Sequence, residues 1–353
     1  MKPSIKDIAE QVGISKAAVS IYLSDPQTRR VGSRTKEKIR KAVNEMNYRP
    51  NAVARALSSS KTKIIGILIP YNSSIFRSTF ADEMLSGIQS VLYPRGYSML
   101  FMPAEGKSSR DMVANHLENG LGYDGYILFG TRFCTLDDMK HNAELMKSTH
   151  LPFVVVNMPE IDMEINQTLD MDPPETNVAD YLLRLGHRQI VLVAGRENAP
   201  ESRLAIENFK SSLESHGIET KIENILYGDY ERDVARSVML KRIDSGEDFT
   251  AVYTLADTMA AGIYEALKHY GLRIPEDVTV VGRNNSFFSN LMDPPLTTVS
   301  RPIFELGARA ADSVLRTIDG AEDTRKVVLK TTLIQRTSSA PRITETNPEK
   351  GKV

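Results

Sequence analysis

The sequence predicts an all-α head followed by an α/β body in two similar halves. Three observations predict this: helical periodicity with capping residues over the first 48 positions, strand-length apolar runs alternating with amphipathic stretches beyond Lys63, and an uneven charge. Residues 1–63 hold 14 Lys and Arg and 5 Asp and Glu (net +9), whereas residues 64–353 hold 30 and 40 (net -10). Such a split favours a polyanion-binding head, with an ordinary solvated basic face as the alternative.

The first two predicted helices are short and closely linked. Ser4 can cap a helix that carries apolar residues at helical spacing and ends at Gly13, and Ser15 can cap a second helix, KAAVSIYL. The link is only Gly13 and Ile14, so the helices must meet at a steep angle. On the second helix we expect Val19 and Leu23 to be buried, and the outward-facing residues are Lys16, Ala17, Ser20 and Ile21.

This arrangement is a helix-turn-helix, in which the start of the second helix can enter a major groove and read base edges. A third helix is predicted after Ser33, with Ile39, Val43 and Met46 on its buried face, so that the head ends near Tyr48. A packed helical hairpin that binds no DNA is the alternative interpretation.

The body has the pattern of parallel βαβ units. The predicted strands are IIGILI at 64–69, YSMLFM at 97–102, YILF at 126–129, FVVV at 153–156, IVLV at 190–193, AVYTL at 251–255 and VTVV at 278–281. The pattern repeats in two halves, about 62–160 and 161–290, and a late strand stretch at 327–334 suggests that the chain crosses back between them. A ligand is expected in the cleft at the carboxyl ends of the strands.

The sequence lacks the motifs that are typical of several classes of enzyme. No GxxxxGK[ST], GxSxG or HExxH occurs, and the histidines are scattered, so we expect no catalytic residue, no metal and no cofactor. The glycines of GxGxxG at 120–125 precede a strand, the reverse of the dinucleotide-binding order. A single cysteine, Cys134, no run of 18 apolar residues and no signal-like amino terminus predict a cytoplasmic protein without a membrane partner. His187, just before a strand, is expected to be structural.

Five segments in order resemble the lactose-repressor/galactose-repressor (LacI-type) transcription regulators, from Ile5 to about residue 339. They are IKDIAEQVGISKAAVS, RPNAVARAL, LGHRQIVLVAG at 185–195, GLRIPEDVTVVG at 271–282 and PPLTTV at 294–299. The resemblance implies a helix-turn-helix DNA-binding head and hinge helix, followed by a two-lobed effector domain like the periplasmic binding proteins. The expected domains are 1–48 (head), 49–61 (hinge helix and linker), 62–340 (effector-binding and dimerisation, with lobe 1 about 62–160 plus 292–322 and lobe 2 about 161–291 plus 323–340) and 341–353 (polar tail).

For DNA, the resemblance implies backbone and base contacts from both the head and the hinge. Pro50 suits a first helical turn, and Leu57 corresponds to a wedge that partly unstacks the central base step. Ile21 stands where many members have arginine, which leaves Lys16 as the strongest candidate for polar base readout. The expected DNA-binding residues are Ile5, Ser15, Lys16, Ala17, Ser20, Ile21, Gly32, Thr35, Asn51, Ala54, Arg55 and Leu57.

For the effector, the resemblance implies contacts in the cleft, where several polar residues of this chain differ from those that are usual in the family. Family members often have Asp at the positions of Asn157 and Asn284, and an Arg at the position of Ala205. A neutral polyol or saccharide stays possible, because an amide can both donate and accept. The expected effector-binding residues are Phe80, Arg132, Asn157, Asp170, Arg203, Tyr230, Asp257 and Asn284.

The resemblance therefore implies a transcriptional regulator, by default a repressor, that binds a near-palindromic operator in double-stranded DNA as a homodimer. A small-molecule effector, possibly a sugar or sugar derivative, controls it. Residues 340–353 contain no leucine, so the leucine heptad that makes some members tetrameric is not expected. The alternatives are a small-molecule-binding protein with a vestigial DNA head and an α/β enzyme acting on a sugar or nucleotide.

Overall fold

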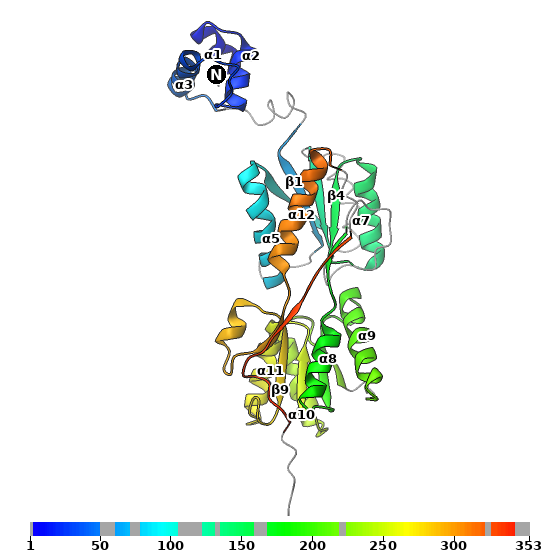
Figure 1. Ribbon diagram of the computed structural model, residues 1–353. Helices are drawn as coiled ribbons and strands as arrows, with labels where there is room; N and C mark the ends of the chain where they lie inside the picture. Colours follow the sequence, from blue (N-terminus) through cyan, green and yellow to red (C-terminus); the bar gives the residue numbers. More distant parts are fainter. Residues whose placement is uncertain are drawn as a thin grey trace, which may run out of the picture. The chain divides into compact units, whose positions relative to one another are not determined.

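The structure is a computed structural model that describes residues 3–49, 61–70, 78–104, 122–130, 135–158, 168–218, 224–321 and 326–342. The chain divides into two compact units, residues 1–63 and 64–353. The first unit is the head, a three-helix bundle of α1 (Ile5–Val12), α2 (Lys16–Ser24) and α3 (Ser33–Glu45) (Figure 1).

The capping residues set the ends of the first two helices. The Ser4 hydroxyl accepts from the Asp7 amide while the Asp7 carboxylate accepts from the Ser4 amide, a capping box at the start of α1. Gly13 ends α1 in the left-handed region at φ 73°, which a side chain would disfavour. Ser15 caps α2 by accepting from the Ala18 amide. The expected bounds of α1 and the expected start of α2 are confirmed, and α2 continues one residue beyond the predicted KAAVSIYL, to Ser24.

The head encloses a small core of its own. Its buried members are Ile8, Ala9, Val19, Val31, Ile39, Ala42 and Tyr48. Val43, Met46 and Leu23 are only partly buried at its edge, so the stripe predicted for α3 is centred on Ala42 rather than Val43. Tyr48 closes the core where the sequence placed the end of the head.

The second unit contains two six-stranded sheets. The first has the order β11-β5-β4-β3-β1-β2 and is parallel throughout, and the second has the order β12-β10-β9-β8-β6-β7, in which only β12 runs antiparallel to its neighbour. The strands of the first sheet are β1 (Ile64–Pro70), β2 (Ser98–Ala104), β3 (Gly125–Phe129), β4 (Phe153–Val156), β5 (Thr168–Met171) and β11 (Lys326–Leu329). Those of the second are β6 (Ile190–Ala194), β7 (Ile225–Tyr227), β8 (Ala251–Thr254), β9 (Thr279–Asn284), β10 (Thr297–Ser300) and β12 (Thr332–Ile334).

Helices cover the sheet of lobe 1 on both faces (Figure 1). On one face, α5 (Thr79–Leu92) and α12 (Ile303–Ile318) are side by side and nearly in backbone contact. A Cβ on Gly87 would lie 2.0 Å from the Phe304 carbonyl oxygen, so only glycine permits this approach. The opposite face packs against α7 (Leu136–Ser148). A one-turn helix, η2 (Tyr93–Arg95), follows α5.

Lobe 2 has its own larger core. Its helices are α8 (Glu175–Arg184), α9 (Pro200–Ser215), α10 (Arg232–Asp244) and α11 (Asp257–His269), with the short η4 (Phe287–Leu291) after β9. His187 lies in lobe 2 between α8 and β6, and burial lowers the pKa of its imidazole. Its Nε2 lies 3.0 Å from the Ala340 carbonyl oxygen, which can only accept, so Nε2 carries the proton. The ring thus joins lobe 2 to the carboxy-terminal segment.

The sheets correct the expected lobe boundaries in three places. β5 pairs with β4 in the first sheet, so lobe 1 continues past residue 160 to about 171. β10 pairs with β9, which places residues up to Ser300 in lobe 2 rather than lobe 1. The stretch 327–334 is two strands, of which β11 belongs to lobe 1 and β12 to lobe 2.

The chain therefore crosses between the lobes three times: after β5, after β10 and between β11 and β12. The late crossing was expected from the sequence. β5, β7 and β10 were not predicted as strands, because they are only three or four residues long, and in β5 and β10 polar residues interrupt the apolar ones.

Candidate functional site: a basic helical head and a cavity between two lobes

The exposed start of α2 is the candidate DNA-reading surface of the head. Lys16 and Ala17 are exposed, and Ser20 is half-buried. Ile21 is also half-buried and packs on the head core, which corrects the expectation that it points fully outward. Its apolar contact with DNA is therefore limited to the part of the side chain that the core leaves uncovered.

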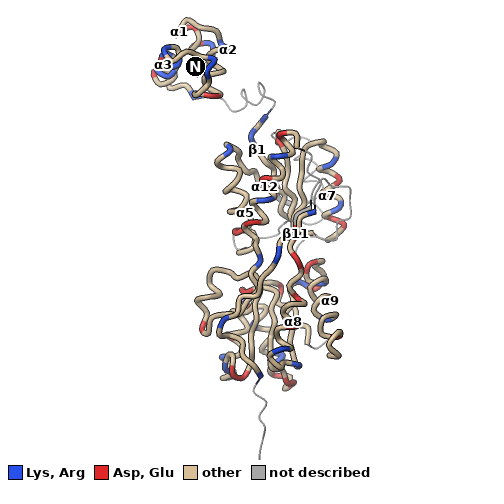
Figure 2. Tube along the Cα trace, viewed as in Figure 1, with Lys and Arg blue, Asp and Glu red and all other residues tan. Residues whose placement is uncertain are grey.

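Other expected DNA contacts surround this helix start. Ser15 is exposed at the cap of α2, and Gly32 is exposed before α3. Thr35 and Ile5 are half-buried. Figure 2 shows Lys and Arg on all three helices of the head. The exposed ones are Lys6, Lys16, Arg34, Lys38, Arg40 and Lys41. This surface has the positive charge that contacts with phosphates require.

The expected hinge contacts, Asn51, Ala54, Arg55 and Leu57, lie outside the described residues, as does Arg132 in the body. Their assignment to DNA and effector stays a prediction from the resemblance.

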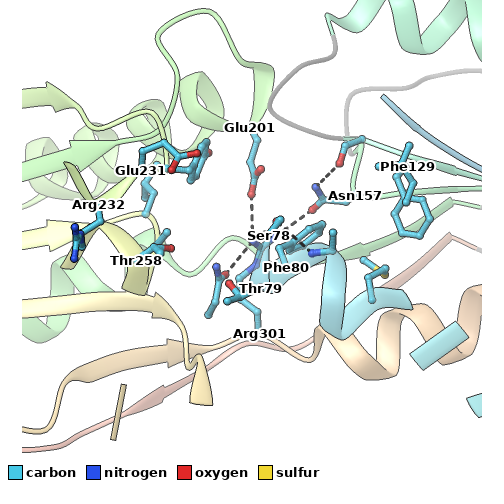
Figure 3. Close-up of a pocket in the computed structure, with 18 of the residues that line it drawn as sticks. Ser78, Thr79, Phe80, Phe129, Asn157, Glu201, Glu231, Arg232, Thr258 and Arg301 are labelled. Carbon is cyan, nitrogen blue, oxygen red and sulfur yellow. Dashed lines mark hydrogen bonds and ion pairs between the residues drawn. The ribbon is translucent and has the colours of Figure 1, made fainter. Parts of the chain in front are cut away.

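The body contains a cavity of about 330 Å³ where strand ends of both lobes meet helix starts (Figure 3). Lobe 1 contributes the start of α5, the end of β3 and the end of β4, and lobe 2 contributes the starts of α9, α10 and α11 and the end of β9. The lining residues are Ile69, Ser78, Thr79, Phe80, Ala81, Met84, Phe129, Gly130, Asn157, Glu201, Tyr230, Glu231, Arg232, Asp233, Leu255, Ala256, Thr258, Asn284 and Arg301. Its position at the carboxyl ends of parallel strands is the one predicted from the sequence.

Three lining residues have backbones in the left-handed region that side chains disfavour. They are Asn157 at φ 59°, Tyr230 at φ 58° and Asn284 at φ 107°. Asn adopts such angles more readily than most residues, whereas Tyr does so rarely. Concentrated strain of this kind is typical of ligand sites, where the surrounding fold holds side chains in place.

A network of buried charges forms the floor of the cavity. The Glu201 carboxylate accepts from Arg301 at 3.2 Å and from Arg283 at 3.0 Å, and Arg283 also pairs with Glu175 at 3.5 Å. Burial raises the pKa of Glu175. Burial also opposes ionisation of Glu201, but the two arginines outweigh it and lower the pKa of that carboxyl.

A second cavity of about 220 Å³ lies on the other side of this network. It shares Asn157, Glu201 and Arg301 with the first cavity, and its other lining residues are Met158, Asp170, Met171, Asp172, Pro173, Pro174, Glu175, Pro200, Leu204, Ala205, Asn208 and Arg283. Burial raises the pKa of Asp170 to about 6. The Glu201–Arg301 pair thus lines both cavities.

The structure brings five of the expected effector residues to these cavities. Phe80, Asn157, Tyr230 and Asn284 line the first, and Asp170 lines the second.

Two other expected effector residues, Arg203 and Asp257, do not line either cavity. Arg203 is exposed on α9 and is absent from both linings, because two residues of helix turn it away from the face that carries Glu201. Asp257 is fully buried, and its carboxylate accepts from the Ser286 amide and the Thr298 hydroxyl, both at 2.6 Å. It holds the start of α11 to β10 and the loop after β9.

Sequence reasoning missed Glu201, Arg283 and Arg301. The signal was weak, since each lies within or beside a predicted element and its burial depends on partners far away in the chain. Among the described residues no group of three His, Cys, Asp or Glu could hold a metal ion, and no helix is long and apolar enough to cross a membrane.

Known proteins match both units. The model of bacterial regulatory proteins of the lacI family matches residues 4–51, and that of the periplasmic binding protein-like domain matches residues 179–339. The HTH-type transcriptional repressor PurR of Vibrio vulnificus (strain CMCP6) is 31% identical over 328 residues, 92% of this chain and 94% of that protein. The catabolite control protein A of Priestia megaterium is 28% identical over 314 residues, 88% and 91% of the two chains.

Solved structures share the fold. The lac repressor dimer bound to operator and the anti-inducer ONPF has a TM-score of 0.85 at 23% identity, with 96% of this chain and 100% of that chain covered. A LacI family transcriptional regulator from Enterococcus faecium with bound ribose has a TM-score of 0.67 at 26% identity, with 79% and 99% covered.

A basic helix-turn-helix head on a two-lobed α/β body with a cavity at the strand ends defines a ligand-controlled, DNA-binding regulator of transcription. The chain belongs to the lacI family of bacterial regulatory proteins.

Proposed function

We propose that this protein is a cytoplasmic repressor that binds a near-palindromic operator as a homodimer and is controlled by a small molecule, carbohydrate-related, in the cavity between its lobes. The observation that carries the proposal is the combination, in one chain, of a capped α2 with an exposed Lys16 and a cavity shared by two lobes. The PurR relatives that are named repressors support the direction of control.

The head supports sequence-specific binding by one half of a dimer. Lys16 and Ala17 occupy the first turn of α2, which is the part of a recognition helix that reaches base edges. The expected backbone contacts from Ser15, Gly32 and Thr35 surround it. A single head offers few contacts, so a dimer that reads two half-sites about 34 Å apart is needed for a stable complex.

An exposed apolar surface on lobe 2 supports the dimer. Phe287 is 80% exposed and Leu291 is 75% exposed, both on η4. Large apolar side chains that are this exposed are typical of contact surfaces. We propose that η4 belongs to the dimer interface.

The three crossovers give the effector a route to the head. A ligand that contacts both lobes binds one lobe arrangement more tightly than another and therefore shifts their populations. Asn157 in lobe 1 and Tyr230 in lobe 2 both line the cavity and can bind one ligand together. The Enterococcus faecium regulator with bound ribose supports a carbohydrate-related ligand.

We also propose that the protein binds its effector without converting it. A small-molecule-binding protein with a vestigial DNA head is the competing candidate, and an α/β enzyme is the other. Incubation with a carbohydrate panel tests the enzyme, because product formation would contradict binding alone.

The decisive experiment is selection from random double-stranded DNA with the purified full chain, followed by binding of the selected DNA against salt. We expect a near-palindrome with a steep salt dependence, because phosphate contacts release counterions. Lys16→Ala should lower affinity for the selected sequence more than for random DNA, whereas Lys41→Ala, at an exposed position of α3, should change both by the same small factor. If no sequence is enriched, with or without a metabolite pool, the head is vestigial.

A further inference from the structure

The Arg301 guanidinium occupies a central position in the cavity that the sequence did not indicate. Arg301 follows β10 directly and belongs to the crossover that leads from lobe 2 into α12 of lobe 1. It is only 7% exposed, yet it lines both cavities. A buried charge at this point contacts whatever occupies the space between the lobes.

Most of its hydrogen bonds go to neutral groups. Nη2 donates to the Asn157 amide oxygen at 3.1 Å, and Nη1 donates to the Asn284 amide oxygen at 3.4 Å and to Glu201 at 3.2 Å. The Phe80 ring lies 5.5 Å from the guanidinium carbon. Among the described residues nothing accepts a hydrogen bond from its Nε. Figure 3 shows Glu201 and Asn157 joined to this guanidinium.

The charge of Arg301 is less well balanced than that of its neighbour Arg283. Both arginines donate to the same oxygen of Glu201, but only Arg283 also pairs with Glu175. Burial works against the charge of Arg283, yet Glu175 and Glu201 outweigh it and raise its pKa. For Arg301, burial and then the repulsion from Arg283 prevail, and its pKa is lowered.

The start of a helix in lobe 1 also faces the cavity, with Asp82 as the acidic residue of its first turn. Ser78 and Thr79, at the start of the 14-residue helix α5, line the cavity beside Phe80. The first turn of a helix carries a partial positive charge. The acidic lining residues Glu231 and Asp233 stand at the start of α10 in lobe 2, and in Figure 3 Glu231 lies on the far side of the cavity from Asn157.

We propose that the effector carries an anionic group, a carboxylate or a phosphate, that binds Arg301 at the lobe 1 side of the cavity beside the start of α5. The proposal rests on the proposed function, because it assigns the chemistry of the ligand in that cavity. An anion gives Arg301 a charged partner of its own, beside the Glu201 oxygen that it shares with Arg283. It also contacts the crossover itself, which connects ligand binding to α12.

The test compares charged and neutral forms of one sugar on the full-length protein. The probes are a hexose, its aldonate, its uronate and its 6-phosphate, measured by titration calorimetry and by the shift in melting temperature. We expect at least one anionic probe to bind about tenfold or more tightly than the neutral hexose, since one charge contact shifts an equilibrium by about that factor. The aldonate and uronate against the phosphate distinguish the two anions.

Two substitutions examine the role of Arg301 without removing it. Asn284→Asp and Asn157→Asp each place a carboxylate against its guanidinium and should weaken the anionic probe by about tenfold or more. Asn284→Asp is the primary variant, because Asn157 also donates to the Gly130 carbonyl oxygen and its replacement affects packing. Asn177→Asp, the same change at an exposed position of α8, is the matched control and should leave probe binding unchanged.

Three results would overturn the proposal: the neutral hexose binding as tightly as every anion, anion binding that survives both Asn→Asp variants, or no binding by any anion of the panel. Operator selection in the absence of probe tests the regulator separately. A protein that selects an operator but binds no anion refutes the ligand chemistry alone.

Discussion

Replacing Glu201 by Gln should destabilise the body, because Glu201 is the ionised partner of two buried arginines. Its carboxylate lies 3.0 Å from Arg283 and 3.2 Å from Arg301, and both guanidiniums are at least nine-tenths buried. Removing one partner of a buried pair costs about 3–5 kcal/mol, because the remaining charge is left without compensation. Since the Glu201 side chain is 27% exposed, we expect the lower value, about 3 kcal/mol.

That loss corresponds to a melting temperature lower by roughly 5 °C for the unit of residues 64–353, measured on the full chain by circular dichroism. Glu214→Gln is the matched control, because Glu214 is exposed on the same helix, α9, and its replacement should leave the melting temperature unchanged. Adding Arg301→Gln to Glu201→Gln should recover part of the loss, since it removes an uncompensated charge. Equal melting temperatures for Glu201→Gln and Glu214→Gln would refute the account of the buried network.

Three further predictions concern the head, the interface and pH. Gly13→Ala should destabilise the head by about 1 kcal/mol, because the φ of 73° strains alanine while its Cβ meets no neighbour, and faster amide exchange in α1 and α2 would report it. Phe287→Ser and Leu291→Ser should each weaken the dimer by about tenfold or more in sedimentation, and unchanged association would exclude η4 from the interface. Burial raises the pKa of Asp257 from 3.8 to about 6, so the folded state holds this proton more tightly than the unfolded state. Stability should therefore fall as the pH rises from about 4 to 6, by up to about 1.4 kcal/mol per pKa unit, and Asp257→Asn should flatten that part of the pH profile.

The head was predictable because its signals are local. Ser4, Gly13 and Ser15 each act on a backbone group within a few residues, so the helix bounds follow from the sequence. Ile21 shows the limit of this reasoning. Helical spacing places it on the outer side of α2, but the way α2 packs on α1 and α3 leaves it half-buried.

The cavity was predictable in position but only partly in content. Parallel strands end on one side of their sheet, which brought Asn157, Tyr230 and Asn284 together as expected. Glu201, Arg283 and Arg301 could not be found in this way, because α9, β9 and the crossover after β10 meet only in the folded lobe. The lobe boundaries failed for a similar reason, since sheet membership depends on pairing partners and not on the length of a run.

Two of the crossovers are fastened to each other, which restricts how the lobes can move. Only Lys330 and Thr331 link β11 of one sheet to β12 of the other, and two residues span at most about 7 Å. Asp172, in the crossover after β5, donates from its amide to the Leu329 carbonyl oxygen at 2.9 Å and accepts from the Thr331 amide. Because this connection is short and is held by two hydrogen bonds to the crossover after β5, we expect the lobes to rotate relative to each other and not to move apart. An insertion of one or two residues beside Thr331 would lengthen this connection and allow more relative arrangements of the lobes. Ligand binding in the cavity would then be coupled less strongly to the arrangement of lobe 1.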